Sequence, residues 1–261
     1  YKICMVYGKI KSNSEALDYM SNSLLHVNIL TIYPEMFPGS LNFGVVGNAL
    51  NNNIWSLNVI DIKKFGFGKH KNIDEKPVGG GPGMIMRSDV IDDAIRYAQS
   101  NMNVNIPLIY LTPKGKPLSQ DISKKLSKYK KVNILCGRFG GIDERIILHY
   151  KPLELSLGDF ILSGAEIAAQ ALIDSVVRLL PGTLGNKNST SNETFSSNLF
   201  EYPQFTKPNI WNGYEIPNVL LSGDHKAIKL WRHNQSKIIT KERRSDLWKK
   251  FLNSDIDAFD K

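Results

Sequence analysis

The fold of this chain is decided by one stretch, Val132–Glu166, which reads VNILCGRFGGIDERIILHYKPLELSLGDFILSGAE. It opens with an apolar run of strand length, Val132–Cys136, which leads into a glycine-rich loop. A helical pattern over Ile142–Tyr150 and a short apolar run over Leu153–Leu157 follow, and a second glycine-rich loop comes before the end of the stretch. A strand, a helix and a strand in this order are typical of parallel strands joined by a crossover helix.

The same alternation continues on both sides of this stretch. It predicts an α/β fold with a mostly parallel sheet covered on both faces. Ser88 and Ser119 precede helical patterns and are predicted N-caps, because a serine hydroxyl can accept a hydrogen bond from a free backbone N–H. The other predicted strands are Val27–Tyr33, Leu57–Ile62 and Pro107–Leu111, and the other predicted helices are Gly44–Ile54, Asp89–Gln99, Gln120–Tyr129 and Ser163–Leu180.

The sequence predicts four parts along the chain. Residues 1–26 form a poorly patterned N-terminal extension, and residues 27–184 form the α/β domain. Gly185–Asn198 is polar and has no core-forming period, which predicts a flexible linker or lid. Residues 199–261 contain Pro-rich turns and then basic helical runs, which predict a small helical C-terminal domain. The two runs are Lys226–Ile239 and Lys241–Leu252.

Composition and charge are those of a soluble globular protein with a basic excess. The chain has 261 residues, 42% of them hydrophobic and 22% charged, and its formal net charge is +8. Such an excess suits a polyanionic partner, although many enzymes without one carry as much. Two cysteines far apart give no disulfide framework and indicate a reducing compartment. No apolar run approaches the roughly 20 residues of a membrane span, and Tyr1–Ser23 resembles neither a signal nor a transit peptide, so we expect a cytoplasmic protein.

The segment Val78–Met84, VGGGPGM, contains four glycines in seven residues. Consecutive glycines are unfavourable for folding, and a plain surface turn needs only one or two, so this segment is predicted to be a binding loop. The alternative is a tight turn without a ligand. The segment is not a phosphate-binding P-loop, because the lysine and the Ser/Thr of that motif are missing.

Three further loops each follow a predicted strand: Tyr110–Pro113, Cys136–Gly141 and Ser156–Gly164. In an open parallel sheet, ligands bind beyond the carboxyl ends of the strands, so these loops are predicted to close around one ligand. Neither glycine-rich loop has the GxGxxG spacing, which disfavours a dinucleotide. The loops alone do not name the ligand, and ordinary turns between strands and helices also use glycine.

Six motifs occur in the order that is typical of one family. Together they resemble the bacterial tRNA (guanine-N1)-methyltransferases, which modify the guanine on the 3′ side of the anticodon. The resemblance extends from about Val27 to about Trp248. The motifs are GGGPGM at Gly79–Met84, YLTP at Tyr110–Pro113, CGRFGGIDER at Cys136–Arg145, SLGDFILSGAE at Ser156–Glu166, LIDSVVRLLPG at Leu172–Gly182 and VLLSGDH at Val219–His225.

The resemblance implies a SPOUT methyltransferase, an α/β fold whose sheet region is tied in a deep trefoil knot. It implies a homodimer with active sites shared between two chains, and a C-terminal helical domain that grips the anticodon stem-loop of tRNA. It also implies that the knot loops bind S-adenosyl-L-methionine. The corresponding residues are Tyr110, Leu111, Thr112, Pro113, Gly137, Arg138, Gly141, Ser156, Leu157, Gly158, Asp159, Phe160, Ile161, Leu162 and Gly164.

Two residues correspond to the family's catalytic pair. Guanine N1 carries a proton, so methylation needs a base that removes it and a positive group near O6. The resemblance gives the second task to Arg178; without the resemblance, Arg178 would simply favour the negative end of its helix. The family base is an aspartate fifteen positions later, where Glu193 stands here. It remains a carboxylate, with an arm one methylene longer.

The same resemblance bears on the donor loop, on magnesium and on the residues that contact the substrate. Gly140 stands where the family usually has a glutamate, which removes a carboxylate close to the donor. The family uses Mg²⁺ for turnover, so magnesium is an expected requirement, but the sequence offers no compact group of metal ligands. The expected substrate-binding residues are Gly79, Gly80, Gly81, Gly83, Lys226 and Arg232, and the expected phosphate-contacting surface also includes Lys229, Lys237, Lys241, Arg243 and Arg244.

Two other functions stay open from the sequence. One is a knotted methyltransferase that acts on ribose 2′-hydroxyls or on ribosomal RNA, against which the GGGPGM motif and the linker carboxylate speak. The other is an RNA-binding protein that kept the fold and lost the activity. Only the departures at Gly140 and Glu193 support it.

Overall fold

The computed structural model describes residues 4–7, 23–100, 106–185, 194–195 and 198–259. The chain splits into two compact units, Tyr1–Gly185 and Asn186–Lys261, and each is described here by itself. None of the helices among the described residues is long and apolar enough to cross a bilayer.

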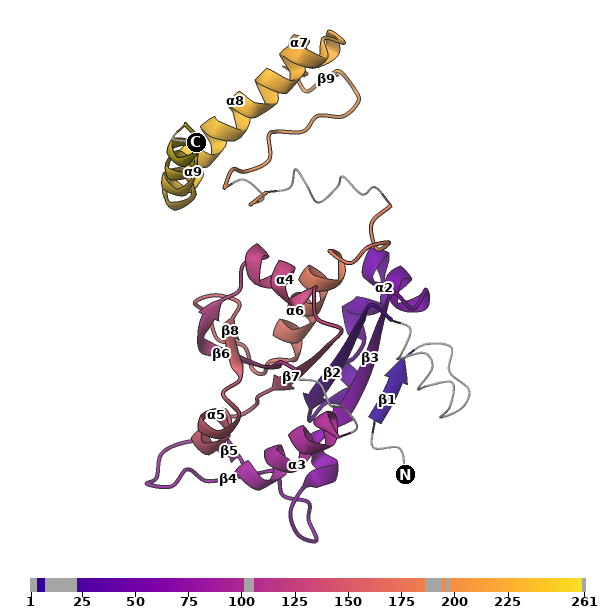
Figure 1. The fold of residues 1–261 in the computed structure, drawn as a ribbon, viewed down its shortest axis with the longest axis vertical. Coiled ribbons are helices and arrows are strands. Elements are labelled where there is room, and N and C mark those ends of the chain that lie inside the picture. The colour runs from indigo at the N-terminus through magenta and orange to yellow at the C-terminus, as the bar shows by residue number, and fades with distance from the viewer. Residues whose placement is uncertain (1–3, 8–22, 101–105, 186–193, 196–197, 260–261) are drawn as a thin grey trace. The chain divides into compact units, whose positions relative to one another are not determined.

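The first unit is built on a sheet of six strands in its described part, in the order β1-β3-β2-β7-β6-β8 (Figure 1). All neighbours pair in parallel except β1, which lies antiparallel at the edge beside β3. The mostly parallel sheet predicted from the alternating pattern is therefore confirmed. The strands are β1 (Cys4–Tyr7), β2 (Leu25–Thr31), β3 (Trp55–Asp61), β6 (Leu108–Pro117), β7 (Lys131–Cys136) and β8 (Leu153–Ser156).

The N-terminal region differs from its prediction as a poorly patterned extension. Its residues Cys4–Tyr7 form β1, and β2 begins at Leu25, two residues before the predicted strand. The edge strand has few residues and no alternation, so no sequence period distinguishes it.

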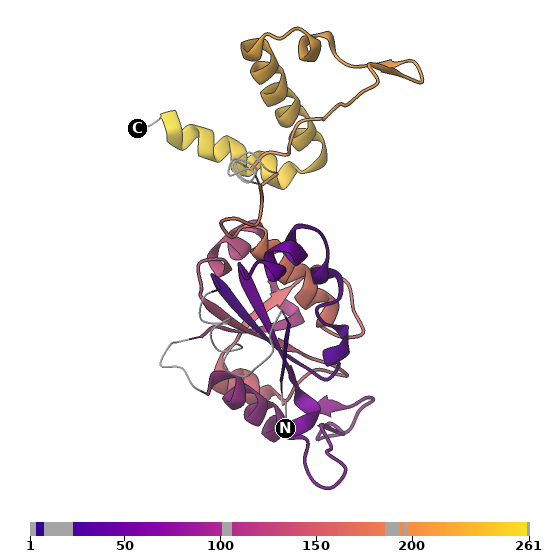
Figure 2. The ribbon, with the colours of Figure 1, turned by 90° about the vertical axis from the view of Figure 1, so that its right-hand side faces the viewer.

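Helices cover both faces of the sheet, as predicted (Figures 1 and 2). Residues that alternate along a strand point to opposite faces, so Ile29 and Leu30 of β2 enter two different hydrophobic cores. The helices α2 (Gly44–Asn51), α4 (Gln120–Leu126) and α6 (Glu166–Val177) contribute to the first core, and α3 (Ser88–Gln99) and α5 (Glu144–Tyr150) contribute to the second. Short elements complete the unit: η1 (Pro34–Met36), η2 (Gly39–Asn42), η3 (Ile62–Phe65), and a small ladder of β4 (Asp74–Glu75) with β5 (Ile85–Met86).

Of the two predicted N-cap serines, Ser119 is confirmed and Ser88 is wrong. The Ser119 hydroxyl accepts a hydrogen bond from the Ile122 amide and caps α4. The N-cap of α3 is Arg87 rather than Ser88, and no side chain caps that helix, since Ser88 already lies inside its first turn. Asp143 caps α5 by accepting a hydrogen bond from the Arg145 amide, so that helix begins two residues later than predicted.

Two boundaries beside the predicted loops also differ from the predictions. The strand predicted to end at Leu111 continues as β6 to Pro117, because β8 pairs with its far end. The helix predicted to begin at Ser163 begins at Glu166, because Ser163 and Gly164 belong to the preceding loop.

The second unit contains a short hairpin followed by helices. The predicted break between the basic helices lies further along the chain, since the first helix runs through Arg243. Arg244 has a non-helical backbone, with φ −142° and ψ 78°, and the chain turns sharply there (Figure 2). The elements are β9 (Ile210–Trp211), β10 (Tyr214–Glu215), α7 (Asn218–Leu221), α8 (His225–Arg243) and α9 (Ser245–Phe259).

Candidate functional site

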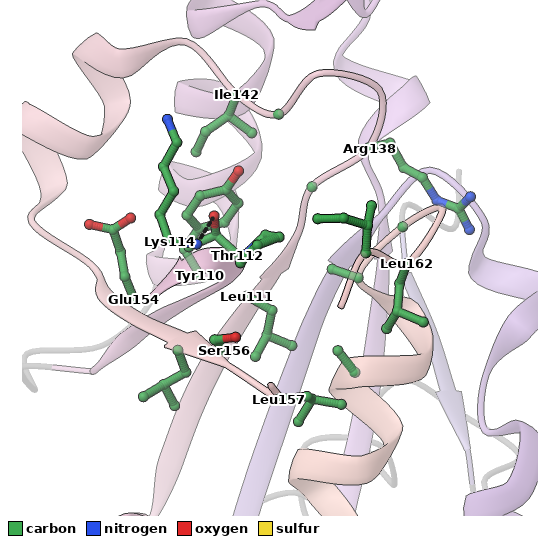
Figure 3. A pocket seen from close by; sticks show the side chains of 18 of the residues that line it. Tyr110, Leu111, Thr112, Lys114, Arg138, Ile142, Glu154, Ser156, Leu157 and Leu162 are labelled. Carbon is green, nitrogen blue, oxygen red and sulfur yellow. Dashed lines mark hydrogen bonds between the residues drawn. The ribbon is translucent and has the colours of Figure 1, made fainter. Parts of the chain in front are cut away.

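A cavity of about 430 Å³ lies at the carboxyl ends of β6, β7 and β8 (Figure 3). The three loops predicted to share a ligand meet around it, because parallel strands end at the same edge of a sheet. Of the fifteen residues predicted to bind a cofactor, Asp159 alone is absent from the lining. The lining residues among them are Tyr110, Leu111, Thr112, Pro113, Gly137, Arg138, Gly141, Ser156, Leu157, Gly158, Phe160, Ile161, Leu162 and Gly164.

Tyr110 forms one wall of the cavity, and two glycines make room for its ring. A Cβ on Gly137 would lie 2.9 Å from Tyr110 Cε2, and a Cβ on Gly141 would lie 3.3 Å from the phenol oxygen. Burial raises the pKa of Tyr110, so the phenol stays protonated and can donate a hydrogen bond at neutral pH. The two glycines are therefore needed for packing around Tyr110.

The glycine-rich loop that precedes β5 is joined to the loop after β7. The Gly140 amide donates to the Met84 carbonyl over 2.8 Å, and the Met86 amide donates to the Gly141 carbonyl over 3.0 Å. The glycines predicted to bind substrate, Gly79, Gly80, Gly81 and Gly83, all have positive φ, between +86° and +121°, which explains why glycine stands at each. This exposed loop therefore continues from the rim of the cavity.

The lining also contains residues that sequence reasoning missed. The charged residues among them are Glu144, Glu154 and Lys114. Because the Arg138 cation is neutralised by Glu166, the remaining charges in the lining are two acidic and one basic. Glu144 lies within the motif CGRFGGIDER and could have been predicted from that motif. Glu154 lies two residues before the loop that begins at Ser156, outside any of the motifs, so the sequence did not indicate it. The remaining missed residues are Phe139, Gly140, Ile142, Ile147, Leu155, Ser163, Ala165 and Ala168.

Arg138 lines the cavity, but its side chain is engaged elsewhere. Its guanidinium forms an ion pair with Glu166 at 2.8 Å and points away from Tyr110 and Leu111 (Figure 3). The burial of Glu166 is complete, at 0% exposure. That Arg138 binds a cofactor stays a prediction: the residue lines the cavity, and its guanidinium pairs with Glu166.

Comparison with known proteins gives one consistent answer. The family model described as tRNA (Guanine-1)-methyltransferase TrmD matches residues 25–250. The chain belongs to this family. Curated tRNA (guanine-N(1)-)-methyltransferases are similar over most of their length: one from Ehrlichia canis is 53% identical over 233 residues, covering 89% of this chain and 98% of that protein. One from Wolbachia pipientis wMel is 50% identical, covering 85% and 94%. One from Ruegeria pomeroyi is 50% identical, covering 85% and 91%.

The residue matched to the arginine of the TrmD family lies outside the cavity. Arg178 is the C-cap of α6, whereas Ala165 and Ala168 line the cavity at the other end of that helix. Ten residues of helix separate Ala168 from Arg178, which corresponds to about 15 Å. Within one chain, Arg178 is therefore not part of the lining of the cavity. Glu193, the predicted base, lies outside the described residues.

The predicted RNA-binding residues of the second unit lie on α8, except Arg244, which is the C-cap of that helix. Lys226 and Arg232 are exposed, and the Arg232 guanidinium stacks on the Tyr202 ring at 4.7 Å. Asp224 caps this helix by accepting hydrogen bonds from the Lys226 and Ala227 amides. His225, at the first position of α8, is exposed.

No group of three or more metal-ligating side chains gathers anywhere in the described part of the chain. Two carboxylates, Glu144 and Glu154, line the cavity, and they come from different elements. These side chains alone are too few to form a dedicated magnesium cage.

Proposed function

We propose that this chain transfers a methyl group from S-adenosyl-L-methionine to N1 of the guanine on the 3′ side of the anticodon, position 37 of tRNA. The observation that carries the proposal is the meeting of all three motif loops around one cavity, in a chain of the TrmD family. A tRNA-modifying enzyme acts where tRNA is found, so the proposal includes a cytoplasmic location.

The cavity suits the proposed methyl donor. Its volume of about 430 Å³ lies in the range of sites for drug-sized ligands. Apolar side chains from Leu111, Leu157 and Leu162 and backbone amides of the glycine loops suit an adenosine, and the acidic lining suits a cationic sulfonium. When bound, the donor supplies an electrophilic methyl group. The protein's own residues would orient it and exclude water.

The chemistry of the transfer requires one base and one cation beside the guanine. In our proposal, the Glu193 carboxylate accepts the proton of N1 as N1 attacks the methyl carbon. The Arg178 guanidinium stabilises the negative charge that gathers on O6. Removing one such electrostatic partner costs enzymes about 10²–10³ in rate.

The position of Arg178 supports a homodimer with shared active sites. Since about 15 Å of helix separates Arg178 from the cavity of its own chain, a second chain is needed to bring an arginine to the guanine. In a symmetric dimer, each chain would supply the donor cavity to one site and Arg178 to the other.

The trefoil knot and the tRNA grip remain part of the proposal. For the knot, the support is that β8 pairs with β6 rather than with β7, and that Arg138 bridges to Gly164 across the two loops. For the grip, the support is the exposed basic face of α8, including Lys226 and Arg232. Lysine and arginine side chains of this kind bind RNA phosphates. Glycines of the VGGGPGM loop would contact the substrate beside the cavity.

Magnesium is an expected requirement that the described residues do not by themselves satisfy. They hold no compact ligand group, so we assign no step of the reaction to Mg²⁺. Titrating the transfer reaction with a chelator, and then restoring Mg²⁺, measures whether turnover needs the ion.

The deciding experiment is methyl transfer from labelled S-adenosyl-L-methionine to unmodified tRNA. We expect transfer to a transcript with guanine at position 37 and none to the same transcript with adenine there. Equal labelling of both transcripts would refute the proposed site. Calorimetry without tRNA tests the donor separately, since absence of donor binding would favour an RNA-binding protein without activity.

Two substitutions test the assigned roles. Arg178→Ala and Glu193→Gln should each lower kcat at least 100-fold, because each removes a charge that acts in the transition state. Donor affinity, measured by calorimetry, should stay within twofold of the unsubstituted protein, since neither residue is assigned to the donor. Normal turnover by Glu193→Gln would show that another group is the base.

A further inference from the structure

The Arg138 guanidinium points away from Tyr110 and Leu111 and contacts other parts of the protein (Figure 3). Its Nε and Nη2 atoms lie 2.9 and 2.8 Å from Glu166 Oε2, and Nη1 donates to the Ser163 carbonyl over 3.2 Å. The guanidinium also stacks on the Tyr33 ring at 4.6 Å. Its Nη2 lies 3.5 Å from the Met36 sulfur. The cation therefore has partners in two separate chain segments, residues 33–36 and residues 163–166.

Glu166 is fixed from the opposite side. It is the first residue of α6 and is fully buried, at 0% exposure. Its Oε1 accepts a hydrogen bond from the Thr31 hydroxyl over 2.8 Å, and that hydroxyl oxygen also accepts from the Tyr33 amide over 3.0 Å. A buried carboxylate needs such partners, because desolvation of an unpaired charge is very unfavourable. The end of β2 thus holds Glu166, which in turn holds Arg138.

The backbone joins the same segments. The Ala165 amide donates to the Gly137 carbonyl over 3.2 Å, and Arg138 forms an antiparallel bridge with Gly164. Gly164 has to be glycine here, because a Cβ on it would lie 2.0 Å from Arg138 Nε. The loop after β7 and the loop before α6 therefore cross at Arg138, and both loops line the cavity.

We propose that Arg138 and Glu166 are positioning residues, a loop clamp that sets the distance between the two glycine-rich walls of the donor cavity. Arg138 then acts on donor affinity through Glu166 and not by touching the donor. The inference rests on the proposed function, since it takes S-adenosyl-L-methionine as the ligand of the cavity.

A double-mutant cycle on donor affinity separates the clamp from direct contact. The four proteins are the unsubstituted chain, Arg138→Met, Glu166→Gln and the double variant, and the probe is S-adenosyl-L-methionine in calorimetry. The clamp predicts that each single variant weakens Kd at least tenfold and that the double variant is no weaker than the worse single one. Direct contact by Arg138 predicts that Glu166→Gln binds normally, and that result would overturn the proposal. Additive losses, or no loss in either variant, would overturn it as well.

Steady-state kinetics provide a readout that a general loss of folding would not reproduce. KM for the donor should rise at least tenfold, whereas kcat at saturating donor and Kd for tRNA should stay within twofold. A fall in kcat with unchanged donor KM would contradict the clamp. Arg96→Met is the matched control, because it removes an arginine from an exposed ion pair with Asp92 on α3. It should leave donor KM unchanged.

A milder substitution covers the case in which the charged variants fail to fold. Thr31→Val keeps the shape of the side chain and removes the hydroxyl, with its hydrogen bond to Glu166 Oε1 and the one that it accepts from the Tyr33 amide. It should weaken donor Kd several-fold, and an unchanged Kd would overturn the proposal. If the unsubstituted protein does not bind the donor, the proposed function fails and not the clamp. If it binds and the variants bind equally well, the clamp alone fails.

Discussion

His26 is a buried base held in its neutral form by the strands around it. Its Nε2 lies 3.0 Å from Asn28 Oδ1, and its Nδ1 lies 2.8 Å from Ser56 Oγ. Asn28 Nδ2 donates to Asn133 Oδ1 over 2.7 Å, so Asn28 Oδ1 is an acceptor and His26 Nε2 carries the hydrogen. Burial, with a smaller effect of the Lys131 charge, lowers the pKa of His26 from 6.5 to about 4.

This pKa makes folding stability depend on pH. The unfolded chain binds a proton at His26 below pH 6.5, whereas the folded chain does so only near pH 4, so the stabilisation is complete above pH 6.5 and is lost as pH falls toward 4. By pH 5 the loss should be about 2 kcal/mol. Urea unfolding at pH 7.5 and pH 5 measures it. In His26→Gln this part of the pH dependence should disappear, and an equal loss in both proteins would contradict the assignment.

The polar neighbours of His26 were not predictable from the sequence. The strand predictions rested on apolar runs, which indicate where strands lie and give no register between strands that are distant in sequence. Only the observed register places Asn28 opposite Asn58 and Asn133 on the neighbouring strands. Asn58 Nδ2 then donates to Asn28 Oδ1 over 2.9 Å, so these buried polar side chains are hydrogen-bonded to one another, whereas Asn58 Oδ1 and Asn133 Nδ2 have no hydrogen-bond partner among the described residues. A single-sequence period cannot contain this information.

The pairing of β6 with β8 shows a similar limit for whole elements. Pro113 and Gly115 are poor strand formers, and the strand was predicted to end at Leu111, before Thr112-Pro113. In the structure β6 continues past them, and its pairing with β8 shifts register between Leu111 and Lys116. Such an irregularity allows proline and glycine within a strand. The loops of the cavity could be predicted because each one is contiguous in sequence. The irregular end of β6 could not, because it depends on pairing with β8, which lies about forty residues further along the chain.

Gly115 is the position at which this pairing is most sensitive to substitution. A Cβ there would lie 2.5 Å from the backbone N and C atoms of Leu155, and backbone cannot move aside as a flexible side chain can. Gly115→Ala should therefore destabilise the first unit by about 1–3 kcal/mol, through forced separation of β6 and β8. Urea unfolding measures this change. Gly185→Ala is the control, since a Cβ there meets no atom within 4 Å, and its stability should change by less than about 0.5 kcal/mol. Equal stability of the two variants would exclude the crowding at Leu155.

At the scale of the whole molecule, the sequence predicted which loops and residues form the site, but it did not predict how far apart they lie in the fold. The motif loops gather at one sheet edge, as the rule for open parallel sheets predicts. Arg178 could be assigned from its motif, but its distance from the cavity became visible only when α6 was placed in the fold. In the proposed mechanism, a second chain explains why Arg178 lies at the opposite end of α6 from the cavity.

Complementation between two inactive chains tests that explanation. Arg178→Ala keeps the donor cavity, and Leu157→Trp fills the cavity while keeping Arg178; calorimetry checks that the second variant does not bind the donor. Random co-assembly of equal amounts gives half mixed dimers, and each mixed dimer has one site with an intact cavity from one chain and Arg178 from the other. Co-expressed chains should therefore recover about a quarter of the activity of the unsubstituted protein. If Arg178 served the cavity of its own chain, every site would lack one part, and the mixture would stay as inactive as the separate variants.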